Sequence, residues 1–245
     1  MLESVADWFR WLNEAHGINL TIFYDPIDAK KFASGIWTTI ELSVACVIAS
    51  TIVGVVGAWL QQSSLAWTRR LVQAYIQFFR NTPPLVQLYF FYFALDAALA
   101  HLVDAGNLLG SFGWAWVSLS FFAGSFNVEI FRAGIEAVPK STVEAAEALG
   151  YTRFGVYRHV VLPLAFRITL PALNNNLVNL VKTTTIAYAI AVPETLYMAN
   201  QIWSDSVNVP EMMNVVMIVY LVLVGALVWM MGRWQRAMKV PGIGR

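Results

Sequence analysis

The sequence predicts an all-α membrane protein that crosses the bilayer with about five helices. Of its 245 residues, 58% are apolar and only 13% are charged, whereas an average soluble domain has about 25% charged residues. The charges are also unevenly spread, because long uncharged runs alternate with short charged segments. About 20 mostly apolar residues span the hydrocarbon core as a helix, and a soluble domain of this size could not bury so much apolar length.

Five stretches are poor in charge, and we expect each of them to cross the membrane. The expected spans are residues 36–60, 83–103, 108–131, 168–193 and 212–232. In the first of them, Trp37 and Trp59 lie about 33 Å apart along a helix. That spacing places one indole at each membrane interface, where tryptophan is enriched. We therefore expect residues 35–235 to form one transmembrane domain.

The flanks of this domain have a different character. Residues 65–80 are expected to form an interfacial or helix-flanking segment, because Arg80 would be costly at mid-bilayer. Pro83-Pro84 is either a break that lines a pathway or the first turn of the second span, where a missing N–H costs nothing. Residues 1–34 are expected outside the membrane core, with a short amphipathic helix on the outer leaflet. Four residues at helical spacing predict that helix: Val5, Trp8, Phe9 and Leu12.

The basic residues predict the orientation. Lys and Arg gather in alternate connections: residues 69–80 hold three, residues 132–167 hold five, and residues 233–245 hold four, whereas residues 96–110 and 194–211 hold none. Cytoplasmic loops carry the excess of Lys and Arg. We therefore expect the first loop, the third loop and the tail at 236–245 in the cytoplasm, and the N-terminus outside.

The composition also excludes several classes of function. A net charge of +1 gives no field that would attract nucleic acid. The single cysteine, Cys46, excludes an intramolecular disulfide and a thiolate cluster. His16, His101 and His159 are isolated in the sequence, and no nucleophile motif is present. We expect no metal site and no catalytic residues, and hence no enzyme.

The third loop, residues 138–165, has the clearest local signals. Ser141 and Glu144 have the spacing of a capping box at a helix start, and Gly150 is placed to end that helix in the left-handed conformation. Val143, Ala146 and Leu149 recur every three residues, which predicts an apolar edge. This helix is too short to be stable alone.

A second helix is expected directly after the first. Thr152 can cap it, and Pro163 should end it at Leu162. The result is a compact helix–turn–helix on the cytoplasmic side. A short helix with an apolar edge of small residues is suited to dock into a groove of another protein.

These residues resemble a known family. Glu144-Ala145-Ala146, Gly150 and Val161-Leu162-Pro163 are similar to the EAA loop in permease subunits of binding-protein-dependent ABC importers. The resemblance extends along the chain and is closest to the polar amino acid type. Its further segments are residues 79–87 (FRNTPPLVQ), residues 129–135 (EIFRAGI) with residues 138–140 (VPK), residues 180–184 (LVKTT) and residues 192–194 (VPE).

The resemblance implies a type I transmembrane domain in a bacterial inner membrane, surrounded by lipid. It implies that the EAA loop docks into a cytoplasmic ATPase subunit, through Glu144, Ala145, Ala146, Leu149 and Gly150. ATP and Mg²⁺ would be bound by that partner, because no Gly-Lys dipeptide of a P-loop occurs here. A second permease chain, identical or a sister, would complete the pore, and an extracytoplasmic binding protein would deliver the solute. The solute could be a polar amino acid or a derivative such as an opine.

Polar residues of the fourth span are candidates for the solute pathway. Asn175, Asn179 and Lys182 share one helix face, and Thr183 follows where many relatives carry an acid or Asn. Lys182 is either a structural partner of a carboxylate or a pathway residue. The alternative function is a self-sufficient secondary transporter or channel, but five spans do not divide into the equal halves of an inverted repeat.

Overall fold

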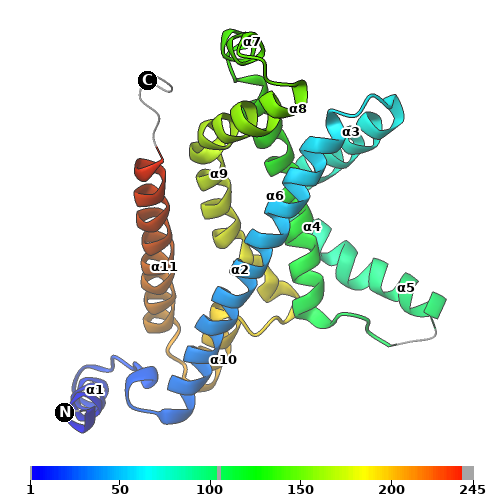
Figure 1. Cartoon of the computed structure of the whole chain (residues 1–245). Helices are drawn as coiled ribbons and strands as arrows, with labels where there is room; N and C mark the ends of the chain where they lie inside the picture. Colours follow the sequence, from blue (N-terminus) through cyan, green and yellow to red (C-terminus); the bar gives the residue numbers. More distant parts are fainter. Residues whose placement is uncertain (1, 104–105, 239–245) are drawn as a thin grey trace. The chain divides into compact units, whose positions relative to one another are not determined.

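The computed structural model describes residues 2–103 and 106–238, and the predicted tail lies outside the described residues from residue 239 onward. Every regular element in this described part is helical, as the sequence predicts (Figure 1). The α-helices are α1 Leu2–His16, α2 Pro26–Gln61, α3 Ala66–Asn81, α4 Pro84–Tyr89, α5 Asp96–Val103, α6 Gly110–Glu136, α7 Lys140–Ala148, α8 Arg153–Val156, α9 Leu162–Thr183, α10 Thr195–Ser206 and α11 Val209–Ala237. Short 3₁₀ turns occur at Thr21–Phe23 and Thr184–Ile190, and π-helical turns at Phe90–Leu95 and Tyr157–Val161.

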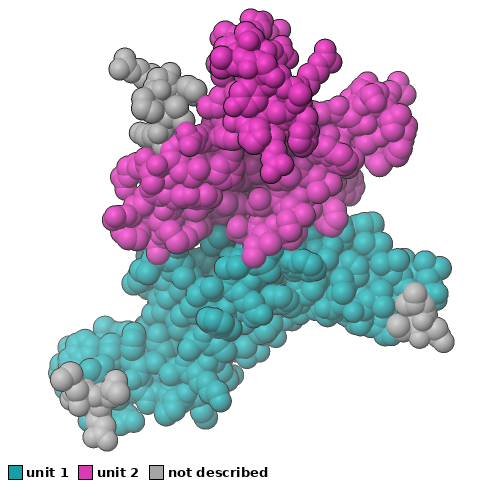
Figure 2. Space-filling model, viewed as in Figure 1, with its two compact units in different colours: residues 1–45, 88–117, 181–225 teal, residues 46–87, 118–180, 226–245 magenta. Residues whose placement is uncertain are grey.

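The helices form two compact units, which Figure 2 shows in two colours. Unit 1 comprises residues 1–45, 88–117 and 181–225, and unit 2 comprises residues 46–87, 118–180 and 226–245. The long helices α2, α6, α9 and α11 each contribute residues to both units. The predicted loop at residues 138–165 lies entirely in unit 2.

Unit 1 is held together by an apolar core and by buried polar contacts. Phe32 of α2 packs with Ala199 and Ile202 of α10 and with Met212 of α11. Close packing of these side chains holds the three helices together through many small dispersion contacts. The short connection between α10 and α11 is tied to the N-terminal segment, because the Asn208 side chain donates to the backbone C=O of Asn19 at 2.8 Å.

A buried carboxylate organises the start of α10 in the same unit. Glu194 is fully buried, and its side chain accepts the backbone N–H groups of Leu196 and Tyr197 at 3.0 and 2.9 Å. The Tyr220 hydroxyl of α11 donates to the same carboxylate at 2.9 Å. Glu194 therefore acts as the N-cap of α10, since these bonds satisfy N–H groups that have no partner within the helix.

Close helix contacts define unit 2. A Cβ atom added at Gly54 would lie 2.4 Å from Asn127, and one at Gly57 would lie 2.3 Å from Val128. These glycines of α2 therefore let its backbone approach α6, as small residues do between membrane helices. A similar approach joins α6 to α9, where a Cβ atom at Gly134 would lie 2.1 Å from Thr169.

Three helical stretches of the described chain are both long enough and apolar enough to cross a membrane: residues 26–61, 84–102 and 209–237. They correspond to the first, second and fifth expected spans. The third and fourth fall on α6 and α9, whose 27 and 22 residues give lengths of about 40 and 33 Å. These two helices carry more polar residues, several of which face the protein. The number of spans and the orientation remain predictions.

Several predicted local features appear in the structure. The amphipathic N-terminal segment is helical as α1, and Phe9 stacks on Phe23 with ring centroids 4.3 Å apart. Residues 65–80 correspond to the separate helix α3. Pro84 is the first residue of α4, as the first-turn interpretation of Pro83-Pro84 predicts.

The fourth predicted span differs in its helix boundaries. The α-helix α9 begins at Leu162 and ends at Thr183, and a 3₁₀ turn continues to Ile190. At this change the hydroxyls of Thr184 and Thr185 donate to the carbonyls three residues earlier, at 2.7 and 2.8 Å. Hydroxyl groups that bond nearby carbonyls compete with regular helical bonding, and the change coincides with these contacts.

Candidate functional site

The third loop forms a compact element built on α7, whose start differs from the prediction. The helix begins at Lys140 with Pro139 as its N-cap, and no side chain caps it. The N–H groups of Thr142 and Val143 donate to the C=O of Pro139 at 3.0 and 3.4 Å. The predicted capping box of Ser141 and Glu144 is therefore wrong. Proline lacks an N–H and has a fixed φ, so it defines the helix start before Ser141 is reached.

The end of α7 confirms the predicted role of Gly150. This glycine has a φ of 87°, in the left-handed region. Its N–H donates to the C=O of Glu147 at 2.9 Å, and the N–H of Tyr151 donates to the C=O of Ala146 at 3.2 Å. This pair of bonds is the Schellman motif, which satisfies the last carbonyls of the helix. The chain therefore turns sharply at Gly150 without leaving those two carbonyls unpaired.

The predicted apolar edge of α7 divides into two parts. Ala146 is buried and packs, together with the partly buried Val143, in a core with Val138, Val156, Val161 and Ala165. Leu149, by contrast, is 79% exposed. The edge is therefore mostly used to attach α7 to its own chain. Of the predicted contact residues, Glu144, Ala145, Leu149 and Gly150 are accessible and Ala146 is not.

The second helix begins at the predicted residue but does not end at Leu162, as predicted. The Thr152 side chain accepts the N–H of Gly155 at 3.2 Å, which confirms it as the N-cap of α8. The helix then passes through the π-helical turn Tyr157–Val161 into α9, so Pro163 does not terminate it. The wider turn lies immediately before Pro163, where a regular helix would place the proline ring against the carbonyl four residues earlier.

Two aromatic residues beside Leu149 complete the exposed surface and were not singled out from the sequence. Tyr151 and Phe154 are 48% and 70% exposed. Both follow Gly150 in a polar segment that contains Arg153 and Arg158. This polar setting was the sequence signal that could have indicated that the two aromatic side chains are exposed. We refer to Leu149, Gly150, Tyr151 and Phe154 as the loop tip.

Three consecutive asparagines show how α9 divides its polar residues. The Asn174 side chain is buried and donates to Gln235 at 3.2 Å, and the Asn176 side chain donates to Asn127 at 2.8 Å and to the C=O of Ala123 at 3.1 Å. Asn175, between them, is exposed. The two flanking asparagines therefore have structural contacts, and Asn175 has a side chain directed to the surroundings of the chain.

The other predicted pathway residues of α9 also differ in their exposure. Asn179 and Lys182 are exposed, and Thr183 is half-buried. Asn175 and Asn179 lie within α9, and Lys182 lies in its last turn. Exposed polar and charged side chains of these types are unfavourable against lipid. This face of α9 is therefore suited to contact water, solute or another protein chain.

Comparison with known proteins decides the family. Residues 50–240 match the family model described as the inner membrane component of binding-protein-dependent transport systems. The chain belongs to this family. It is the permease subunit of a binding-protein-dependent ABC importer, located in the inner membrane, and it is a transport component without a catalytic ATPase.

Relatives of this permease are similar to it in sequence over most of its length. It is 32% identical over 206 residues to the probable glutamine ABC transporter permease protein GlnM of Bacillus subtilis, covering 84% of this chain and 91% of the relative. It is 29% identical to the histidine/lysine/arginine/ornithine transport system permease protein HisM of Salmonella typhimurium, covering 96% of both. Among solved structures, an amino acid ABC transporter determined with histidines matches with a TM-score of 0.77 and 27% identity, covering 85% of this chain and 94% of that one.

Proposed function

We propose that this permease forms, with a second permease chain, a pathway through which a polar amino acid or a related small solute enters the cell. Relatives that cover most of the chain are described as transporters of glutamine, of octopine and of histidine, lysine, arginine and ornithine. An extracytoplasmic binding protein would deliver the solute. Separate ATPase subunits, which bind ATP and Mg²⁺, would supply the energy.

The loop tip is the observation that supports coupling to an ATPase. It presents Leu149 and Phe154 to the surroundings in a segment that contains Arg153 and Arg158 and lies outside the expected spans. A small apolar surface on a short helix fits a groove on a partner protein. We propose that the ATPase covers this surface, and that the contact residues are Glu144, Ala145, Leu149 and Gly150, with Ala146 holding the helix in place.

The connection between the tip and α9 suits the transmission of force. Ala146 packs against Val156 and Val161 in one core, and α8 continues through Tyr157–Val161 into α9. Closely packed cores respond to displacement as nearly rigid bodies. Movement of α7 by the ATPase would therefore displace the first turns of α9.

The polar face of α9 is the proposed lining of the solute pathway. We assign Asn175, Asn179, Lys182 and Thr183 to it, because an exposed polar face is what a water-filled pathway requires. The ammonium group of Lys182 could pair with the carboxylate that every amino acid carries. The same positive charge would disfavour solutes whose side chains are cationic.

A reconstitution experiment tests the proposed function. The permease, its partner permease, the ATPase and the binding protein are reconstituted in proteoliposomes, and uptake of labelled amino acids is measured with and without ATP. We expect uptake that requires both ATP and the binding protein. Uptake by this chain alone, without an ATPase, would instead support the secondary transporter or channel.

The proposed orientation can be tested separately. With Cys46 replaced by serine, a cysteine introduced at Ala145 is the only thiol of the chain. We expect a membrane-impermeant maleimide to label it in inside-out vesicles and not in intact spheroplasts. Labelling in spheroplasts would place residues 138–165 outside and contradict the proposed coupling.

A further inference from the structure

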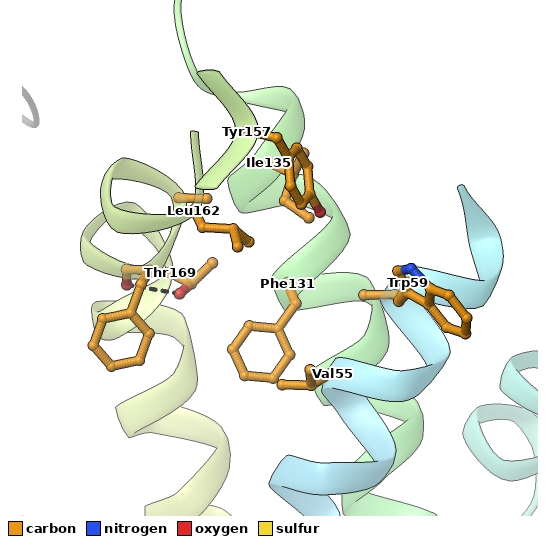
Figure 3. A pocket seen from close by; sticks show the side chains of 10 residues that line it. Val55, Trp59, Phe131, Ile135, Tyr157, Leu162 and Thr169 are labelled. Carbon is orange, nitrogen blue, oxygen red and sulfur yellow. Dashed lines mark hydrogen bonds between the residues drawn. The ribbon is translucent and has the colours of Figure 1, made fainter. Parts of the chain in front are cut away.

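An apolar cavity of about 280 Å³ opens in unit 2 between α2, α6 and α9 (Figure 3). Its lining includes Val55 and Trp59 of α2, Phe131 and Ile135 of α6, and Leu162 and Phe166 of α9. The Thr169 hydroxyl also lines it, but that group donates to the backbone C=O of Phe166 at 2.8 Å, as Figure 3 shows. The cavity therefore presents mainly hydrocarbon, and a hydrocarbon chain is the type of group that it can bind.

A second cavity of about 410 Å³ adjoins the apolar one, and we call it the polar cavity because Gln62, Ser63 and Ser64 contribute polar groups to its lining. It is lined by Leu60 of α2 and by Gln62, Ser63 and Ser64, which directly follow this helix, and it shares Trp59 and Tyr157 with the apolar cavity. Because the same two residues line both, the cavities meet at these rings. Tryptophan and tyrosine have an apolar body and a polar edge and are enriched where hydrocarbon gives way to headgroups. Together the cavities make a site with one apolar and one polar end.

A positive charge is fixed beside the polar end. One terminal nitrogen of Arg69, Nη1, donates to the C=O groups of Ser63 and Ser64 at 2.7 and 3.2 Å. A guanidinium group has five N–H donors, so other donors are available to an anion. Among the residues that the structure describes, no carboxylate lines either cavity. The charge at this end is therefore complementary to a phosphate group.

We propose that this site binds an anionic phospholipid of the membrane leaflet that faces the third loop. One acyl chain occupies the apolar cavity, and the phosphate lies in the polar cavity beside Arg69. The combination of a hydrocarbon cavity, an interfacial ring pair and a fixed cation matches each part of such a lipid. Tyr157 belongs to the π-helical turn between α8 and α9, so the lipid contacts the segment that joins the loop tip to α9. The assignment requires only the membrane location of the permease and is independent of its solute.

Photolabelling of the full-length protein tests the acyl-chain part. The permease is placed in nanodiscs of phosphatidylethanolamine with a phosphatidylglycerol whose acyl chain carries a diazirine, and adducts are mapped by peptide mass spectrometry. We expect adducts concentrated on the cavity residues of α2 and α9. Val55→Trp fills the cavity and should reduce these adducts about tenfold, the effect of losing about 1.4 kcal/mol of binding free energy.

Val56→Trp is the matched control for that variant. Val55 and Val56 are 53% and 47% exposed, and only Val55 lines the cavity. The control should leave the adducts unchanged. Equal labelling of both variants, with adducts spread over all exposed helix faces, would contradict the proposal. So would adducts that vanish once the permease is assembled with its partner permease and ATPase, because a second protein chain would then cover the cavity.

The headgroup part is tested by competition. Unlabelled phosphatidylglycerol should displace the photolabel better than phosphatidylethanolamine does, and inorganic phosphate alone should not displace it. Arg69→Gln should reduce this preference about fivefold, the effect expected of one basic residue near an anionic headgroup. Arg70→Gln, the neighbouring exposed arginine, is the control and should retain it. Equal competition by the two lipids in the unsubstituted protein, or an unchanged preference in Arg69→Gln, would contradict the assignment of the phosphate.

Discussion

The N–H of Tyr151 donates to the C=O of Ala146 at 3.2 Å, across the end of α7. This bond closes the helix around Gly150, whose φ of 87° few other residues tolerate. The buried side of the turn is formed by Ala146 and its core, and the exposed side by Leu149 and Phe154. One backbone geometry thus attaches the loop to its chain and orients the surface proposed to contact the ATPase.

Leu149→Ala should weaken binding of the ATPase without affecting the stability of the permease. The side chain is 79% exposed, so its removal creates no internal cavity, whereas a buried apolar contact with the partner would be lost. Co-purification of the ATPase measures the effect. Leu65→Ala, at a leucine that is 53% exposed beside α3, is the control and should retain the ATPase. Equal co-purification with both variants would exclude Leu149 from the interface.

Thr152→Ala should destabilise the third loop by about 1 kcal/mol, because it removes the hydroxyl that accepts the N–H of Gly155. Thr152→Ser keeps an acceptor and should be close to the unsubstituted protein. Reaction of a thiol-specific dye with Cys46 on heating is a suitable measurement, since this is the only cysteine and it is buried. If the alanine and serine variants unfold at the same temperature, the cap contributes nothing to stability.

Asp96→Leu should destabilise unit 1 by about 1–3 kcal/mol. The Asp96 carboxylate accepts the indole N–H of Trp114 at 2.6 Å and the N–H of Leu108 at 3.0 Å, and buried donors without an acceptor are costly. The same dye assay measures the change. Adding Trp114→Phe removes one of the two donors, so the double variant should lose less than the sum of the single changes. Strict additivity would show that the indole bond is energetically unimportant.

Asn175→Ala and Asn176→Ala should affect different properties of the permease, namely uptake and stability. Asn176 bonds Asn127, which is fully buried, so its replacement should lower stability by about 1–3 kcal/mol. Asn175 is exposed, so Asn175→Ala should lower ATP-driven uptake instead, because this residue belongs to the proposed pathway. Dye-monitored unfolding and uptake are compared for both variants. Unimpaired uptake by Asn175→Ala would remove it from the pathway.

The family could be recognised from the resemblance of its ordered motifs, and the helical class and two helix caps could be predicted because they depend on local chemistry. Gly150 and Thr152 are examples, since a left-handed turn favours glycine and a helix start favours threonine. The start of α7 was mispredicted because two signals compete there. Ser141 fits a capping box, but Pro139, two residues earlier, is the N-cap, so the helix has already begun at Lys140.

The accessible surface of α7 could not be predicted from its spacing. Residues three apart are rotated by about 300° on a helix, so Val143, Ala146 and Leu149 drift away from a common face. Leu149 is moreover the C-cap, beyond the last helical residue. The continuation of the helix past Pro163 depends on the π-helical turn Tyr157–Val161, for which the sequence has no clear signal. The lipid site combines residues of three helices and requires the tertiary structure.

The most direct test of coupling through the third loop is ATP-driven uptake by Gly150→Val and Gly150→Asn in the reconstituted importer. Apart from the adjoining residues, no atom of the described part of the chain lies within 4 Å of a Cβ atom at this position, so within the permease the two variants differ in their tolerance of a φ of 87° and not in space. Asparagine adopts the left-handed region readily and a β-branched residue does not. We predict that Gly150→Asn retains most of the uptake and that Gly150→Val loses it at least about tenfold, the effect of about 1.4 kcal/mol of backbone strain. Normal uptake by Gly150→Val would contradict the account.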